Sequence, residues 1–379
     1  MKVAIVHYWL VGMRGGEKVL EEFCKLYPQA DIYTHAAIPE NLSDTIRRHR
    51  ITETFIARLP GGRKHYQKYL PLMPRALEAL DLTGYDLVIS SESGPAKGVI
   101  THPDALHVCY CHSPMRYIWD QYHIYRAEAG RLTRLMMPWL AHRLRIWDTA
   151  SAARVDHFVA NSGFIARRIA KSWRREAAVI YPPVDVSAFS GPDLAEPEDF
   201  YLYAGELASY KRPDLVVDAF TRSGKPLVVI GEGSERRALE ARAGSNVRFL
   251  GRVSFEDLKD HYRRCRALVF PGVEDFGIIP LEVMASGRPV LAFAEGGAME
   301  TVIEGRTGMF FHEPTVEAVL EGVEALERVL PGFDPQALRD HAAGFTAERF
   351  RAEFKAFVEA RQAELAHHRT NPQGAVAAS

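Results

Sequence analysis

Two glutamates stand eight positions apart in the segment EDFGIIPLE, which runs from Glu274 to Glu282. An apolar, strand-like run, RALVFPGV, precedes the segment, and a helical pattern begins within it. The N–H groups of Phe276, Gly277 and Ile278 are therefore expected near a helix N-terminus, where unpaired N–H groups attract anions. A glycine at 277 allows a phosphate to approach closely, and carboxylates on either side can accept sugar hydroxyls. The pattern indicates a sugar-phosphate site; the alternative is a capping glutamate with a second one nearby by coincidence.

The cations Lys211 and Arg212 form a second candidate, in the segment YAGELASYKRPDL. A strand is predicted to end at Gly205, and a helix is predicted to begin near Pro213-Asp214, because proline and aspartate suit a first turn. Both cations then follow the carboxyl end of a strand, where doubly wound domains bind ligands. A lysine there can neutralise a diphosphate. A pair of solvated loop charges is the alternative interpretation.

Two weaker candidates lie in the first half of the chain. The loop Gly12-Met13-Arg14-Gly15-Gly16-Glu17 follows the first predicted strand and is similar to a dinucleotide fingerprint without matching its spacing. His112 directly follows the apolar run LHVCYC, so it is expected at the same sheet edge, where a histidine can bind a hydroxyl or shuttle a proton. The alternatives are a tight turn and a structural histidine. The G-x-G at Gly231-Glu232-Gly233 is equally weak.

Short apolar runs that alternate with helical patterns must position these residues. Such runs predict a mostly parallel sheet that is covered on both faces. In the first half the predicted strands are Val3–His7, Ala30–Tyr33, Leu87–Ser90, Leu106–Cys111 and His157–Ala160. In the second half they lie in FYLYAGE, PLVVIGEG, NVRFLGRV, RALVFPGV and RPVLAFAEGG. We therefore predict an α/β protein with two doubly wound, Rossmann-like domains.

A proline-rich, acidic stretch separates the two series of strands. Residues 1–182 are predicted to form the first domain, 183–199 a linker, and 200–344 the second domain. Residues 345–366 read as one long amphipathic helix, which we expect to pack back on the first domain. Residues 367–379 are polar and small, and we expect them to form a disordered tail.

The composition limits the classes of partner and compartment. The 379 residues include 47 Lys and Arg against 48 Asp and Glu, a balance that argues against a nucleic-acid partner. Residues 1–182 nevertheless carry a basic excess and the remainder an acidic excess, as expected for domains with different partners. The four cysteines show no C-x-x-C spacing, and no apolar run is long enough to span a membrane. These features predict a cytoplasmic protein with free thiols.

Taken together, the residues resemble the GT-B-fold glycosyltransferases of family 4, which retain anomeric configuration. The resemblance covers nearly the whole chain, from the glycine-rich loop through CHSPMRYIWD and Asn161-Ser162 to Tyr210-Lys211-Arg212, the E-x7-E motif and the closing helix. The stretches HSPMRYIWD and SYKRPDLVVDAF are most similar to those of bacterial polysaccharide mannosyltransferases that use GDP-mannose. The resemblance implies two Rossmann-like domains that face a cleft between them.

The resemblance also implies roles for individual residues. Glu274 matches the glutamate that binds donor-sugar hydroxyls, Glu282 the one that holds the ribose, and Lys211 the diphosphate lysine. The segment that contacts sugar and diphosphate through its backbone is matched by Phe276, Gly277 and Ile278.

Other matched positions lie outside that motif. Gly15 and Gly16 match the loop that closes on diphosphate and acceptor, and His112 matches the histidine near the reacting sugar. Arg252 and Val253 match the loop beside the base. One position departs from the family pattern, because Glu206 stands where an arginine commonly binds the diphosphate, and a carboxylate would repel phosphates. Either Lys211 and Arg212 supply the positive charge instead, or the donor binds weakly.

The implied reaction is metal-independent, retaining transfer of a hexose from a nucleotide-sugar, with the leaving phosphate accepting the acceptor's proton. The predicted acceptor is a polyprenyl-diphosphate-linked oligosaccharide of polysaccharide biosynthesis. Basic stretches interleaved with apolar residues at 47–75 and 131–145 favour contact with an anionic membrane at the cytoplasmic face, although they also fit a core stripe with a solvated rim. Alternatives are a UDP-sugar donor, a nucleotide-sugar epimerase, and a relative that binds without turnover, which Glu206 favours. A nicotinamide-dependent oxidoreductase is disfavoured, because the first glycine-rich loop lacks the G-x-G-x-x-G spacing that such an enzyme requires.

Overall fold

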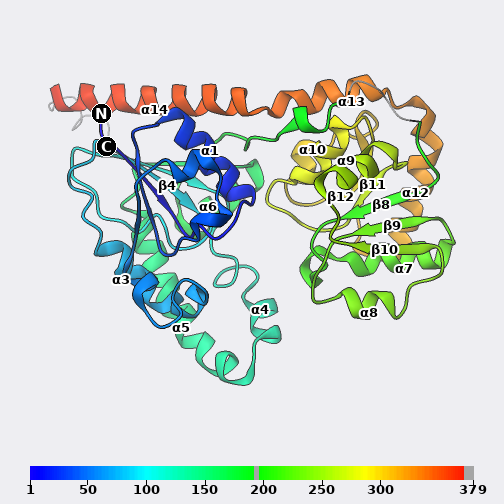
Figure 1. Cartoon of the computed structure of the whole chain (residues 1–379), viewed down its shortest axis with the longest axis horizontal. Helices are drawn as coiled ribbons and strands as arrows, with labels where there is room; N and C mark the ends of the chain where they lie inside the picture. The colour runs from blue at the N-terminus through cyan, green and yellow to red at the C-terminus, as the bar shows by residue number, and fades with distance from the viewer. Residues whose placement is uncertain (192–195, 371–379) are drawn as a thin grey trace. The chain divides into compact units, whose positions relative to one another are not determined.

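The computed structural model describes residues 1–191 and 196–370, and these residues form two compact units (Figure 1). Of the described residues, unit 1 comprises 1–183 and 350–370, and unit 2 comprises 184–191 and 196–349. Each unit contains one parallel sheet with helices packed on it. The α/β prediction with two doubly wound domains is confirmed.

The unit 1 sheet has the strand order β3-β2-β1-β4-β5-β6-β7, with all neighbours parallel. Its strands are β1 (Val3–His7), β2 (Asp31–Thr34), β3 (Ile51–Glu53), β4 (Leu87–Glu92), β5 (Leu106–Cys111), β6 (His157–Ala160) and β7 (Ala177–Val179). Every residue of β1, β4 and β5 is buried, as the continuous apolar runs predicted. The short edge strands β3 and β7 are only half-buried, so they lack such a run and the sequence did not predict them.

The helices of unit 1 vary in length from one turn to several turns. They are α1 (Gly15–Leu26), α2 (Asp44–Arg47), α3 (Met73–Glu78), α4 (Tyr122–Glu128), α5 (Arg131–Ala152) and α6 (Gly163–Trp173), together with the 3₁₀ segment η3 (Tyr66–Leu72). Their apolar stripes pack on the sheet faces. Phe23 of α1 thus lies in the main core, in edge-to-face contact with Tyr110 of β5.

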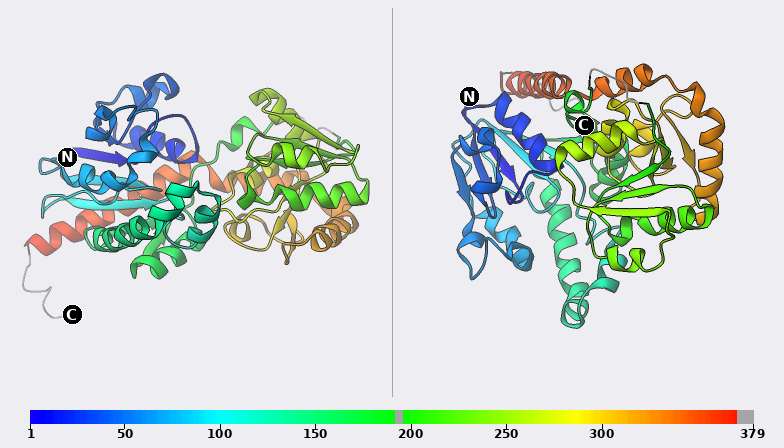
Figure 2. Two further views of the ribbon diagram at one scale, coloured as in Figure 1. Left: turned by 90° about the horizontal axis from the view of Figure 1, so that it is seen from below. Right: turned by 45° about the vertical axis from the view of Figure 1, so that its right-hand side comes forward.

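The closing helix α14 (Ala347–Thr370) returns to unit 1. Phe350, Phe354 and Val358 are fully or almost fully buried in the same core as Phe23. The ring centroid of Phe354 lies 4.5 Å from that of Phe23. Figure 2 shows α14 lying beside the sheet of unit 1. The expected return to the first domain is confirmed, and the helix continues four residues beyond the predicted end at 366.

The unit 2 sheet has the order β10-β9-β8-β11-β12-β13, again all parallel. Its strands are β8 (Tyr201–Ala204), β9 (Leu227–Ile230), β10 (Val247–Gly251), β11 (Leu268–Phe270), β12 (Val290–Phe293) and β13 (Gly308–Phe311). Its helices are α7 (Pro213–Ser223), α8 (Arg236–Glu240), α9 (Phe255–Arg264), α10 (Ile278–Ala285), α11 (Ala298–Thr301), α12 (Val316–Val329) and α13 (Pro335–Ala342). Five of these strands were predicted; β13 is half-exposed at the sheet edge and was not.

Part of the predicted linker packs into unit 2. Phe189 is almost fully buried, and its ring stacks on Tyr262 of α9 at 5.5 Å between centroids. The Val184 N–H donates to the Phe345 carbonyl. Residues 192–195 of that stretch, and 371–379 of the predicted tail, lie outside the described residues. Among the helices that the structure does describe, none is both long and apolar enough to cross a membrane.

Candidate active site

Each sheet reverses its strand order at one point, and most of the predicted site residues lie in loops at or next to these two points. In unit 2 the reversal lies between β8 and β11, and in unit 1 between β1 and β4. In open α/β sheets the crevice beyond the carboxyl ends of the strands at such a reversal is the usual ligand site. The strand order is therefore the property that makes these loops candidates.

In unit 2 the reversal brings Lys211 and Glu274 together. Lys211 lies in the loop after β8 and Glu274 in the loop after β11, and the Lys211 ammonium is 2.9 Å from Glu274 Oε1. Gly272 allows this approach, because a Cβ there would lie 3.1 Å from the Lys211 backbone. Burial opposes the charge on Lys211, but the Glu274 carboxylate raises the pKa of Lys211, so the ammonium stays protonated. The site thus holds a fixed cation beside a carboxylate.

Helix α10 begins beside that ion pair. Gly277 is its N-cap residue and has φ +85°, a left-handed conformation that glycine adopts without strain. The first-turn N–H groups, beginning with Ile278, have no partner within the helix. Phe276 is buried, and its ring packs on Phe345. Glu282 lies one turn along α10 from Ile278 and is mostly buried, with the Tyr262 hydroxyl donating to Oε2 at 3.5 Å.

Two glycines that sequence reasoning missed shape this segment. Gly296 and Gly297 follow β12, and the Gly297 N–H donates to the Glu274 carbonyl at 2.8 Å. A Cβ on Gly296 would lie 2.6 Å from the Glu274 carbonyl oxygen, and one on Gly297 would lie 2.3 Å from Phe276 Cα. The signal was present in the sequence, since a Gly-Gly pair directly follows a predicted strand, but its partner is set by the fold.

Replacing Gly297 with alanine is expected to displace the backbone of Phe276 and to lower the free energy of unfolding by about 1–3 kcal/mol through overpacking. Thermal unfolding measures this loss. The control is Gly332→Ala, because a Cβ at 332 meets nothing within 4 Å. Equal behaviour of the two variants would contradict the role of Gly297.

The remaining unit 2 candidates lie at the same edge with other partners. The Arg212 guanidinium forks onto its neighbour Asp214, with Nε and Nη2 each 2.9–3.2 Å from the carboxylate oxygens. Arg252 is exposed and Val253 half-buried in the turn after β10. Glu206 is exposed after β8, and the Tyr210 hydroxyl lies 3.5 Å from its carboxylate. Of the two candidate cations, Lys211 is therefore the one whose side chain contacts Glu274.

In unit 1 the reversal places His112 in a row of hydrogen bonds. His112 follows β5, and its Nε2 lies 2.9 Å from the hydroxyl of Ser91 at the end of β4. The same hydroxyl lies 2.9 Å from Nδ1 of His7 at the end of β1. Burial and the nearby His7 lower the pKa of His112 to about 3, so its ring is neutral at pH 7. A neutral imidazole can bind a hydroxyl.

The glycine-rich loop and the first turn of α1 lie close to His7, which is part of this row. Gly15 and Gly16 form the first turn of α1. A Cβ on Gly16 would lie 2.4 Å from the Tyr8 hydroxyl and 3.5 Å from the His7 ring. Gly16 is therefore the residue that lets the start of α1 approach the carboxyl end of β1.

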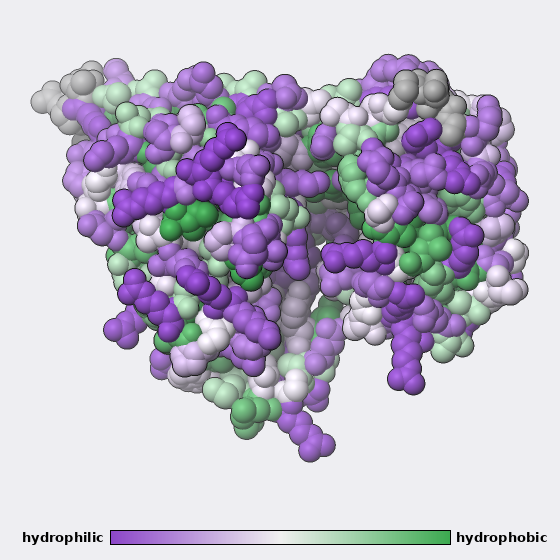
Figure 3. Space-filling model, in the orientation of Figure 1, coloured by the Kyte–Doolittle hydropathy of each residue, from purple (hydrophilic) through white to green (hydrophobic). Residues whose placement is uncertain are grey.

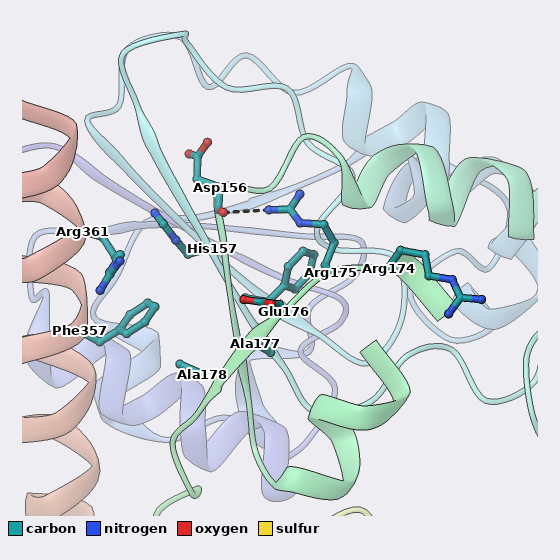
Figure 4. A pocket seen from close by; sticks show the side chains of 10 residues that line it. Asp156, His157, Arg174, Arg175, Glu176, Ala177, Ala178, Phe357 and Arg361 are labelled. Atoms are coloured by element: carbon teal, nitrogen blue, oxygen red, sulfur yellow. Dashed lines mark hydrogen bonds between the residues drawn. The ribbon is translucent and has the colours of Figure 1, made fainter. Parts of the chain in front are cut away.

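A cavity of about 590 Å³ elsewhere in unit 1 contains none of the predicted residues. Figure 4 shows it where β6 and β7 begin, with Phe357 and Arg361 of α14 on one side. Arg175 in its wall donates to the carbonyls of Ala152, Val155 and Asp156 at 2.7–2.9 Å. Its guanidinium thus holds the segment that connects α5 to β6 in place. Within the described residues, no three His, Cys, Asp or Glu side chains lie together in a group that could hold a metal ion.

Comparison with known families accounts for both units. Residues 13–188 match the model for glycosyltransferase family 4, and residues 188–329 match the model for glycosyl transferases group 1. Each half of the chain is thus similar to a glycosyltransferase domain. The loop with Gly15 and Gly16 and the residue His112 belong to the first, and Lys211 and the E-x7-E motif belong to the second.

Individual relatives are distant. The D-inositol 3-phosphate glycosyltransferase of Streptomyces scabiei is 29% identical over 53% of each chain, and the D-rhamnosyltransferase WbpZ of Pseudomonas aeruginosa is 28% identical over 47% of this chain and 49% of its own. The chain thus spans about half the length of the curated relatives it matches. Anabaena HepE in complex with UDP shares the fold, with a TM-score of 0.65 at 15% identity over 95% of this chain and all of its own. The predicted GT-B fold is confirmed.

Proposed function

We propose that the protein is a retaining hexosyltransferase, with the donor nucleotide-sugar bound at the carboxyl edge of unit 2. The Lys211–Glu274 pair beside the start of α10 carries the proposal. A diphosphate placed there meets an ammonium and first-turn N–H groups, and the sugar meets the Glu274 carboxylate. The family models that cover both units support the same assignment.

In the proposed reaction the bond between the anomeric carbon and phosphate breaks, and negative charge builds on the diphosphate. Lys211 and the N–H groups at the start of α10 stabilise that charge as it forms, which lowers the barrier. The acceptor hydroxyl attacks on the face that the phosphate leaves, and the phosphate takes its proton, so configuration is retained. His112 binds a hydroxyl of the reacting sugar as a neutral imidazole. The proposed reaction uses no metal ion, and transfer in the presence of EDTA tests this.

The proposed donor is GDP-mannose, on the strength of the resemblance of HSPMRYIWD and SYKRPDLVVDAF to mannosyltransferase segments. A UDP-sugar is the second candidate, because HepE, which shares the fold, binds UDP. Thermal unfolding with GDP, UDP, ADP, GDP-mannose and UDP-glucose decides between them, since a ligand at 100 times its Kd adds about 2.7 kcal/mol. Stabilisation by GDP and GDP-mannose alone supports GDP-mannose, and selective stabilisation by UDP compounds supports the alternative. Stabilisation by none of them supports a disabled site with Glu206 in place of arginine.

The proposed acceptor is a polyprenyl-diphosphate-linked oligosaccharide at the cytoplasmic face of a membrane. The α5 helix exposes large apolar side chains, and the most exposed are Leu132 at 73% and Leu135 at 79%. Figure 3 shows hydrophobic side chains among hydrophilic ones at the lower end of unit 1, where Figure 1 draws the start of α5. Arg143 stacks on the exposed Trp139 of the same helix. A helix with apolar and cationic side chains suits the boundary of an anionic lipid surface.

The two stretches that the sequence singled out form the walls of one groove in unit 1. Residues of η3 and α5 line a mainly apolar groove of about 500 Å³, and these include Leu70, Pro71, Met136 and Leu140. Lys68 lies at the same groove. An apolar groove beside exposed apolar and basic residues supports lipid contact by this part of unit 1.

The double substitution Leu132→Ser and Leu135→Ser is expected to weaken binding to anionic vesicles about tenfold or more, because each buried apolar side chain contributes about 1.5–3 kcal/mol. Vesicle sedimentation at low and high salt measures this. The control is Met299→Ser with Val329→Ser, which removes two exposed apolar side chains of unit 2. Equal binding of both double variants and the unmodified chain would refute the proposed surface.

A further inference from the structure

Beyond the hydrogen bonds of His112 and Ser91, the row of side chains continues to a buried carboxylate. His7 Nε2 lies 3.9 Å from Glu17 Oε1, and both side chains are buried. The row thus runs from Glu17 of α1 through His7 of β1 and Ser91 of β4 to His112. The segments that it joins flank the strand-order reversal of unit 1.

Glu17 is placed and charged so that it can control this row. Its Oε2 accepts the Arg14 N–H at 3.0 Å, which leaves Oε1 toward His7. Burial opposes its ionisation, but His7 and the backbone N–H groups hold the pKa of Glu17 below its usual range. His7 Nε2 is buried and has no hydrogen bond to any described atom, so the Glu17 carboxylate is the acceptor that it faces.

The carboxylate determines which nitrogens in the row carry protons. An anion facing His7 Nε2 favours a proton on that nitrogen, so Nδ1 of a neutral His7 must accept a hydrogen bond. The Ser91 hydroxyl has one proton and gives it to His7 Nδ1. The Ser91 oxygen then accepts from His112, whose Nε2 must be the protonated nitrogen. His112 Nδ1 is left as an acceptor, and it has no hydrogen bond to any described residue.

We propose that Glu17, acting through His7 and Ser91, is a positioning residue that fixes His112 as the Nε2–H tautomer. His112 then presents Nδ1 to the ligand as a hydrogen-bond acceptor, so the position selects a group that can donate, such as a sugar hydroxyl. The inference rests on the proposed function for its effect on transfer. The tautomer itself is a property of the unliganded protein and is tested without turnover.

The same strand provides a matched control. Ser90 precedes Ser91 in β4, and its hydroxyl lies 2.9 Å from Nε2 of the buried His107. Successive residues of a strand point to opposite faces of the sheet, so the Ser90–His107 pair is chemically alike but separate from His112. Ser90→Ala and Ser91→Ala therefore remove the same type of bond from the same strand.

The ring ¹⁵N signals of selectively labelled histidines give the first test, with the His112 signals identified by their loss in His112→Gln. In the unmodified protein we expect a protonated Nε2 and an unprotonated Nδ1. Glu17→Gln can donate an amide N–H to His7 Nε2, so it should move the proton of His112 toward Nδ1. Ser91→Ala should give a mixture of tautomers, and Ser90→Ala should leave the His112 signals unchanged. A protonated Nδ1 in the unmodified protein overturns the proposal.

Kinetics give the second test. Glu17→Gln and Ser91→Ala are each expected to lower kcat about tenfold, the loss of roughly one hydrogen bond, with the Kd for nucleotide unchanged. Ser90→Ala should retain the original kcat. If Glu17→Gln does not fold, Ser91→Ala carries the test alone. An unchanged kcat in Ser91→Ala overturns the positioning role, whereas absence of transfer by the unmodified protein overturns the proposed function and leaves the tautomer measurement valid.

Discussion

Substitution of Glu274 by alanine is expected to lower kcat/KM for transfer by at least about a hundredfold. A carboxylate contributes about 1.5–3 kcal/mol for each sugar hydroxyl that it binds. Among the described residues, Lys211 is the cation that pairs with the Glu274 carboxylate. The variant also frees the Lys211 ammonium from its 2.9 Å ion pair, so nucleoside diphosphate alone should bind as well as before or more tightly. Steady-state rates and a separate nucleotide titration distinguish the two effects.

A second Lys–Glu pair in unit 2 supplies the control. Glu327 of α12 lies 2.8 Å from the Lys225 ammonium, and its side chain is about as exposed as that of Glu274, whereas Lys225 is more exposed than Lys211. Lys225 precedes β9 and therefore lies at the opposite edge of the sheet. Glu327→Ala should cost a similar amount of stability and leave transfer intact. Turnover by Glu274→Ala at the rate of Glu327→Ala would remove Glu274 from the site.

Substitution of Lys97 by methionine is expected to lower the free energy of unfolding by about 3–5 kcal/mol, the usual cost of removing one partner from a buried ion pair. Lys97 is fully buried in unit 1 and contacts the carboxylates of Asp148 and Glu92. Its ammonium also lies 4.2 Å from the ring centroid of Trp173. Chemical unfolding followed by tryptophan fluorescence measures the change.

The loss in free energy of unfolding caused by Lys97→Met should depend on pH. Burial and the charge of Asp148 raise the pKa of Glu92 to about 6, although Lys97 opposes this. The pKa of Glu92 is about 4.5 in the unfolded chain and about 6 in the folded protein, so the folded protein binds the proton more tightly. The protonated carboxyl therefore contributes fully to stability below about pH 4.5, and this contribution is lost as the pH rises through 6. Without Lys97 the carboxylate is harder still to ionise. The deficit of Lys97→Met should therefore be larger at pH 8 than at pH 5, and a deficit that grows toward low pH would contradict this account.

An exposed pair of the same unit calibrates the measurement. Arg47 pairs with Asp44 on α2, and both side chains are largely exposed, at 46% and 75%. Arg47→Met should leave the free energy of unfolding almost unchanged, because solvent screens such pairs. If Lys97→Met costs no more than Arg47→Met, the buried network is not what holds β4 and α5 together.

Much of the site could be predicted from the sequence because local patterns specify it. The E-x7-E segment follows a strand and begins a helix, which fixes the position of Gly277 at the helix start whatever the rest of the chain does. The apolar runs of β1, β4 and β5 likewise identify buried parallel strands, since both faces must be covered. These features depend on residues a few positions apart.

The tertiary structure alone decided which distant residues meet. Strand order is not written in any one segment, yet it places Lys211 beside Glu274 and His7 beside Ser91. Lys97 looks like a solvated loop residue in SGPAKGV, and it is buried because Asp148 arrives from α5. Contacts between segments that are far apart in sequence depend on packing of the whole sheet, so a local pattern carries no information about them.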